Sequence, residues 1–195
     1  MTIDLAPDGT RQVTIDVPVT MRLARQKDLG VLTKMWGPVG MAERTRVLRR
    51  YFEEYDKNIQ RGLVADFNGN AIGQLWLRLS FIEPAIEDGL AVAYVHTLVV
   101  FPEFRRLGVA EGLIRTASTI AADRGRTHLA IGVDRPNEAA RRLYAKWGFE
   151  HIEDDRSKKV FERNGYDPDV PWKQDGEYIL LCMQKVGDAS LRDAD

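Results

Sequence analysis

The sequence contains few of the residues on which several classes of protein depend. Only 1 of its 195 residues is cysteine, Cys182, which excludes an internal disulfide and a cysteine-based metal cluster. The 3 histidines are not spaced like metal ligands, and we expect no metal site. The glycine-rich loops of common nucleotide-binding proteins, Gly-x-x-x-x-Gly-Lys-Ser/Thr and Gly-x-Gly-x-x-Gly, do not occur.

Neither sign of charge is in excess. The chain has 28 Lys+Arg against 29 Asp+Glu, a net charge of −1, so it lacks the basic field that nucleic acid or an anionic membrane would require. Its longest apolar run, residues 90–101, is interrupted by His96 and Thr97 and is too short to span a bilayer. The first residues show neither the basic nor the apolar part of an export signal. We therefore expect a cytoplasmic protein with no nucleic-acid or membrane partner.

The period of the hydrophobic residues predicts the order of helices and strands. Apolar residues at helical spacing predict helices over 29–36, 41–57, 109–124 and 137–147. Alternating or fully apolar runs predict strands over 19–23, 62–67, 72–81, 91–100, 127–133, 149–153 and 178–184. This order predicts an α/β or α+β fold with one mixed sheet covered by helices. We expect an N-terminal extension (1–18), one domain (19–186) and a flexible tail (187–195).

The stretch from Leu98 to Ala110 contains the end of an apolar strand, a proline turn and a loop that becomes the first turn of a long helix. Backbone N–H groups at a helix start have no intrahelical partners and favour an anion such as a diphosphate. Gly108 and Ala110 would let phosphates approach the backbone, and Arg105 and Arg106 would add positive charge. The residues by themselves fit an ordinary turn with two solvated arginines equally well.

Two motifs resemble the GNAT superfamily of acetyl-CoA-dependent N-acetyltransferases. Residues 98–110 read Leu-x-Val-x-Pro-x-x-Arg-x-x-Gly-x-Ala, which resembles the family's coenzyme A-binding segment, Arg/Gln-x-x-Gly-x-Gly/Ala. Residues 137–149, with Asn137, Tyr144 and Gly148-Phe149 in the family's order, resemble its next helix. The resemblance implies a single mixed, mostly antiparallel sheet of about seven strands flanked by about four helices.

The resemblance also implies how acetyl-CoA binds. The backbone of Leu98, Val99 and Val100 is expected to pair with the pantetheine arm, which acts like an additional strand where the sheet splays. Asn137 is expected to contact the coenzyme. The pyrophosphate is expected to lie against the loop made by Arg105, Arg106, Leu107, Gly108, Val109 and Ala110.

Acetyl transfer needs a neutral amine and a group that protonates the departing thiolate. The resemblance implies that Tyr144 is this general acid, and phenols are protonated at neutral pH; its spacing alone fits a half-buried core tyrosine. His96 occupies the place where many family members carry a glutamate base, and a histidine can accept a proton through water. Alternation along the strand predicts that His96 shares a face with Leu98 and Val100. A structural histidine is the alternative.

The base could instead be one of three acids, Glu83, Glu87 and Asp88, in an acidic loop that would have to fold over the acceptor. Water alone would also serve as the base.

The sequence thus predicts an enzyme that transfers acetyl from acetyl-CoA to the primary amine of a small molecule. The alternatives are a non-catalytic acyl-CoA-binding or regulatory module, a protein or peptide N-acetyltransferase, and a phosphate-binding protein unrelated to coenzyme A. The acceptor side is expected in residues 41–57, 82–90 and 154–176. Trp172 in the last segment would suit a cationic amine or would simply anchor its loop. The sequence does not decide whether the chain forms a homodimer.

Overall fold

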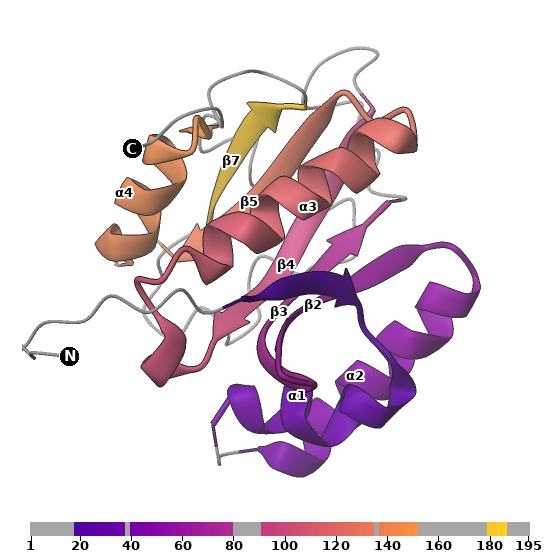
Figure 1. The fold of residues 1–195 in the computed structure, drawn as a ribbon. Coiled ribbons are helices and arrows are strands. Elements are labelled where there is room, and N and C mark those ends of the chain that lie inside the picture. Colours follow the sequence, from indigo (N-terminus) through magenta and orange to yellow (C-terminus); the bar gives the residue numbers. More distant parts are fainter. Residues whose placement is uncertain (1–17, 38–39, 80–90, 135–136, 152–178, 187–195) are drawn as a thin grey trace, which may run out of the picture.

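Figure 1 shows the computed structural model, which describes residues 18–37, 40–79, 91–134, 137–151 and 179–186. The expected N-terminal extension, the acidic loop, the segment 154–176 and the C-terminal tail lie outside these residues. The domain limits given above therefore stay predictions.

A mixed sheet forms the centre of the molecule, with its strands in the order β1-β2-β3-β4-β5-β7-β6. Neighbouring strands are antiparallel except for β4 and β5, which run parallel. This arrangement confirms the predicted fold class. The strands are β1 (Thr20–Leu23), β2 (Gln60–Phe67), β3 (Asn70–Arg78), β4 (Val92–Val100), β5 (His128–Asp134), β6 (Glu150–His151) and β7 (Ile179–Lys185).

Helices cover both faces of this sheet (Figure 1). The first pair, α1 (Leu29–Met35) and α2 (Met41–Asp56), lies on one face, and α3 (Val109–Asp123) and α4 (Glu138–Lys146) lie on the other. Successive side chains of a strand point to opposite faces. Leu75 and Leu77 of β3 are accordingly buried in the core with α3, whereas Trp76 between them is buried with α1 and α2.

The predicted helices and strands are present, with small differences at their ends. The strand expected over 149–153 is only Glu150–His151, and the strand expected to begin at residue 62 begins at Gln60. Asn68 and Gly69 connect β2 to β3 with φ values of 50° and 83°, the left-handed conformations that a two-residue hairpin turn requires. The turn pairs Phe67 with Asn70, and a register shift of one residue between Ala65 and Asp66 then places Gln60 opposite Arg78 at the far end of the hairpin.

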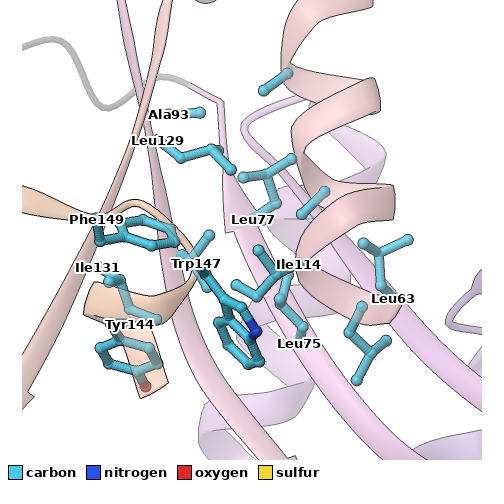
Figure 2. Packing of buried hydrophobic residues seen from close by; sticks show 14 of the residues in the cluster. Leu63, Leu75, Leu77, Ala93, Ile114, Leu129, Ile131, Tyr144, Trp147 and Phe149 are labelled. Atoms are coloured by element: carbon cyan, nitrogen blue, oxygen red, sulfur yellow. The ribbon is translucent and has the colours of Figure 1, made fainter. Parts of the chain in front are cut away.

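The core on the side of α3 and α4 is built from aliphatic and aromatic side chains. Figure 2 shows Trp147 and Phe149, which follow α4, close to Ile131 of β5 and to the leucines of the central strands. Trp147 and Phe149 are only 3% and 4% exposed. Full burial of one such side chain contributes roughly 1.5–3 kcal/mol, so this core anchors α4 against the sheet.

Candidate active site

The parallel strands β4 and β5 separate part-way along their length. Their pairing runs from Val92 with His128 to Val95 with Ile131 and ends there, although β4 continues to Val100. Among the residues that the structure describes, the edge of β4 that faces β5 has no strand partner beyond Val95. Backbone N–H and C=O groups need hydrogen-bonding partners, so an extended ligand could pair with this edge as another strand would. Leu98, Val99 and Val100, the predicted pantetheine residues, lie in this stretch.

A β-bulge lies at the start of the separated stretch. The register between β3 and β4 shifts by one residue between Gln74 and Trp76, so Leu75 lies opposite both Thr97 and Leu98. Thr97 has a φ of 55°, a left-handed conformation that is rare for a β-branched residue. Such strain persists where surrounding contacts hold it, and it clusters at functional sites.

The bulge corrects one prediction about side-chain direction. Tyr94 stacks on His96, with ring centroids 6.2 Å apart, and His96 contacts Tyr51 of α2, so both lie on the face that α2 covers. Val100 belongs to the core with α3, and Leu98 packs against that core. His96 therefore does not share a face with these two residues, because the additional residue in the bulge reverses the alternation.

The loop after β4 turns into α3 through two left-handed residues, Arg106 with a φ of 64° and Gly108 with a φ of 74°. Gly108 is the N-cap of α3, and its carbonyl accepts the first helical hydrogen bond, from the N–H of Gly112 at 2.9 Å. The N–H groups of the three residues between them therefore have no partner within the helix. The positive end of the helix dipole lies at these N–H groups, and it favours an anion there.

The side chains around this helix start leave it open. Leu107 is 66% exposed, and a Cβ added to Gly108 would meet nothing within 4 Å. Arg105 donates from Nε to the carbonyl oxygen of Val100 at 3.2 Å, which ties the loop to the end of β4. Arg105 and Arg106 are both exposed. The structure thus brings residues 105–110 together at one accessible helix start.

The second motif forms the start and the buried side of α4. Asn137 is the N-cap, and its Oδ1 accepts a hydrogen bond from the N–H of Ala140 at 3.1 Å. Tyr144 is 9% exposed, and its ring lies 6.0 Å from those of Trp147 and Phe149 (Figure 2). Tyr144 and Val100 belong to the same hydrophobic cluster. The two motifs therefore meet in one core.

Both ring nitrogens of His96 have side-chain partners. Nε2 lies 2.9 Å from Oε1 of Gln60, and Nδ1 lies 3.1 Å from Oγ1 of Thr97. The amide nitrogen of Gln60 donates to the carbonyl oxygen of Tyr51 at 3.4 Å, so Oε1 of Gln60 is the accepting atom. His96 therefore carries its hydrogen on Nε2, and its Nδ1 accepts from the hydroxyl of Thr97.

Burial and two nearby cations keep His96 neutral. Desolvation, followed by the positive charges of Arg78 and Arg50, lowers the pKa of His96 to about 3. An imidazole with so low a pKa holds a proton weakly. This environment suits a histidine that supports the strained bulge; its function as the base stays a prediction. The competing acids Glu83, Glu87 and Asp88 lie outside the described residues.

Sequence reasoning missed Gln60, Arg78 and the conformation of Thr97. Gln60 is 1% exposed, and Arg78 lies between Gln60 and Tyr94 in the register of three neighbouring strands. The hairpin turn predicts the pairing of β2 with β3, but the register shift between Ala65 and Asp66, which places Gln60 opposite Arg78, has no signature in the sequence. The bulge that follows His96 has no such signature either.

No metal or membrane feature is found in the part of the chain that the structure describes. Within it, no group of three or more His, Cys, Asp or Glu side chains could hold a metal ion. Its helices are also too short or too polar to cross a bilayer.

Comparisons with known proteins agree with this geometry. The model of the acetyltransferase (GNAT) family matches residues 31–149. The chain is 32% identical over 103 residues, 52% of its length and 69% of the relative's, to a protein of Archaeoglobus fulgidus known as an uncharacterized N-acetyltransferase. Two solved structures have a similar fold. PaiA N-acetyltransferase from Thermoplasma acidophilum, in complex with coenzyme A, aligns with a TM-score of 0.61 at 18% identity, covering 86% of this chain and 99% of that one. A GNAT family acetyltransferase from Elizabethkingia anophelis with acetyl-CoA bound aligns with a TM-score of 0.55 at 16% identity, covering 86% and 97%.

Proposed function

The chain belongs to the GNAT family of acetyltransferases, and on that premise we propose that it transfers acetyl from acetyl-CoA to the primary amine of a small molecule. Membership of the family makes it an acyltransferase. One observation supports the proposal above others: the edge of β4 that lacks a strand partner among the described residues leads directly into the open start of α3. A thioester carrier with an extended arm and a diphosphate needs such a pair of neighbouring surfaces.

Acetyl-CoA would bind along these two surfaces. The backbone of Leu98, Val99 and Val100 would pair with the pantetheine arm, and residues 105–110 would hold the pyrophosphate. Asn137 uses Oδ1 to cap α4, which leaves its amide N–H groups to donate to the coenzyme. The two similar structures with coenzyme A and acetyl-CoA bound support a coenzyme in this fold.

The chemistry would be a direct attack by the amine. The amine lone pair attacks the thioester carbonyl carbon, forming the C–N bond, and the C–S bond then breaks with departure of the thiolate. Backbone N–H groups at the free edge of β4 would stabilise the oxyanion that develops on the carbonyl oxygen. Tyr144 would donate its phenolic proton to the thiolate sulfur.

The amine must lose a proton for the reaction to balance. Water or His96 would accept it, and Nδ1 is the ring nitrogen of His96 that has no hydrogen. The low pKa of His96 favours water in the ligand-free protein, and an acceptor that offsets nearby positive charge would make the imidazole a better base.

The experiment measures coenzyme A release from acetyl-CoA with aminoglycosides, polyamines, amino acids and short peptides as acceptors. Wild type and Tyr144→Phe are compared at equal concentration. An acceptor acetylated by wild type and slowed at least about a hundredfold by the substitution supports general acid catalysis. Acetyl-CoA affinity should stay within about threefold, because the substitution removes only the hydroxyl and keeps the aromatic ring.

Two outcomes would favour the alternatives. Saturable acetyl-CoA binding without turnover on any amine would favour a non-catalytic acyl-CoA-binding module. Turnover confined to peptides would favour a peptide N-acetyltransferase.

A further inference from the structure

We propose that Arg78 binds a carboxylate of the acceptor, so that the amine acetylated here belongs to a small molecule that also carries a carboxylate. This inference rests on the proposed acetyl transfer and names the class of its acceptor. Arg78 lies on the face of the sheet that α2 covers, where His96 lies beside the bulge.

The pairing of β3 with β2 and β4 places Arg78 close to His96 and the bulge. Arg78 lies opposite Tyr94 on β4 and opposite Gln60 on β2, and it follows Trp76 by two residues, on the same face of β3. His96 is opposite Trp76 and is therefore the diagonal neighbour of Arg78. Diagonal neighbours in an antiparallel pair are about 7–8 Å apart, a span that an arginine side chain covers. Arg78 can thus reach the point where β4 leaves β5.

Arg78 is a half-buried cation, and no hydrogen bond or ion pair of its guanidinium is found within the described residues. Several other buried or half-buried arginines do have partners. Arg22 binds two aspartates, Arg61 donates to the carbonyl oxygens of Tyr55 and Gln60, and Arg115 binds Glu111. Nε of Arg126 also lacks a hydrogen-bond partner among the described residues, but Arg126 follows the far end of α3. A guanidinium presents five donors in a fork that matches a carboxylate.

The charge around His96 also favours an anion. The positive fields of both Arg78 and Arg50 reach His96. Arg50 has an ion pair with Glu54, but that pair is long, at 3.8 Å, and the side chain of Arg50 is 66% exposed. Arg78 is therefore the better-placed cation, because charge-assisted hydrogen bonds are stronger where water is partly excluded.

The two ends of the acceptor would then have separate surroundings. Its amine would lie near Thr97 and His96, where β4 separates from β5, and its carboxylate would lie on Arg78. A carboxylate at this point would also offset one of the positive charges that disfavour protonation of His96. An amine without an anionic group would leave the guanidinium without a partner among the described residues.

The experiment compares matched acceptors that differ only in the carboxylate. Coenzyme A release is measured with each standard amino acid and with the amine left by its decarboxylation, for example lysine with cadaverine and phenylalanine with phenethylamine. We expect kcat/KM to be at least about tenfold higher for the accepted amino acid than for its amine. Arg78→Met should bring that ratio to about one, chiefly through a higher KM, and Arg78→Lys should restore part of it.

Arg124→Met is the matched control, because Arg124 is an exposed arginine at the C-terminal end of α3. It should leave the ratio as in wild type. Thermal unfolding and acetyl-CoA affinity, measured for each variant, exclude a general loss of structure.

Three results would overturn the proposal: equal or better use of the decarboxylated amines by wild type, a ratio that survives Arg78→Met, or binding of acetyl-CoA with no acetylation of either member of any pair. The first and third need no variant, so they decide the matter even if Arg78→Met does not fold. Failure to bind acetyl-CoA would instead overturn the proposed acetyl transfer itself.

Discussion

The side-chain oxygen of Gln60 accepts a hydrogen bond from Nε2 of His96 at 2.9 Å, and this contact determines which ring nitrogen carries the hydrogen. The other nitrogen accepts from Thr97, whose backbone is strained. Gln60 and His96 thus connect β2 to the bulge in β4. The point at which the sheet opens is held from the face that α2 covers.

The neutral state of His96 should make stability depend on pH. Its folded pKa of about 3 lies below the ordinary value of 6.5, so between these two values the unfolded chain binds a proton that the folded chain does not. The resulting stability is complete above about pH 6.5 and is lost as the pH falls towards 3. From pH 7.5 to 5 the free energy of unfolding should fall by about 2 kcal/mol on this account.

Urea denaturation at the two pH values measures this effect. His96→Gln should remove most of the difference, whereas His151→Gln, at an exposed position of β6, should leave it. An equal pH dependence in wild type and His96→Gln would contradict the burial of a neutral imidazole.

Arg22 joins three elements through two carboxylates. It lies 2.7 Å from Asp28 and 2.7 Å from Asp66, with its side chain only 14% exposed. Burial raises the pKa of Asp28, but the hydrogen bonds from Arg22 and from the N–H of Arg25 outweigh it, so the net pKa is lowered. Hydrogen bonding to Arg22 likewise lowers the pKa of Asp66. The stability from both acids is present above their ordinary pKa of about 4 and is lost as the pH falls further.

Arg22→Met should lower the free energy of unfolding at pH 7 by about 2–4 kcal/mol, because it leaves two carboxylates without their partner. Arg142→Met is the control, since the ion pair of Arg142 with Glu138 is 74% and 71% exposed. That variant should change stability by less than about 0.5 kcal/mol. Urea denaturation measures the free energy of unfolding of both variants. Similar losses for Arg22→Met and Arg142→Met would show that burial of the Arg22 ion pairs does not contribute to stability.

Alanine substitutions at Gly62 and Gly30 should change the stability of the fold in opposite directions, because only Gly62 of the two is in close contact with other side chains. A Cβ on Gly62 would lie 2.8 Å from the Cβ of Ala24 and 2.9 Å from the ring of Trp76. Gly62→Ala should therefore destabilise the fold by about 1–3 kcal/mol. Gly30 in α1 has nothing within 4 Å of its added Cβ, so Gly30→Ala should stabilise it by about 0.5–1 kcal/mol. Calorimetric melting temperatures of the two variants should move in opposite directions.

Gly108 allows a test of the proposed pyrophosphate site. Its φ of 74° costs an alanine about 1–2 kcal/mol, although no protein atom would contact the new methyl group. Gly108→Ala should thus fold with reduced stability and bind acetyl-CoA at least about tenfold more weakly, because the Cβ would also hinder the pyrophosphate. An unchanged dissociation constant would place the pyrophosphate elsewhere.

Much of the fold was predictable because it depends on local patterns. The 3.6-residue period of α3 and the turn at Asn68-Gly69 specify their elements without reference to distant residues. The bulge at Thr97 was not predictable, since it depends on pairing with β3. The contact between Gln60 and His96, which are 36 positions apart, depends on the register of β2 against β3 and of β3 against β4. The prediction that His96 shares a face with Leu98 and Val100 was wrong because the alternation changes at this bulge.

The most direct test of the proposed acetyl-CoA site is a calorimetric titration of the wild-type chain with acetyl-CoA, compared with ATP and NADPH. We expect saturable binding of one acetyl-CoA per chain, with ATP and NADPH unable to compete at equal concentration, because only acetyl-CoA has a pantetheine arm to pair with Leu98–Val100. Equal binding of all three would reduce the site to a phosphate-binding helix start. The absence of acetyl-CoA binding would contradict the proposed function altogether.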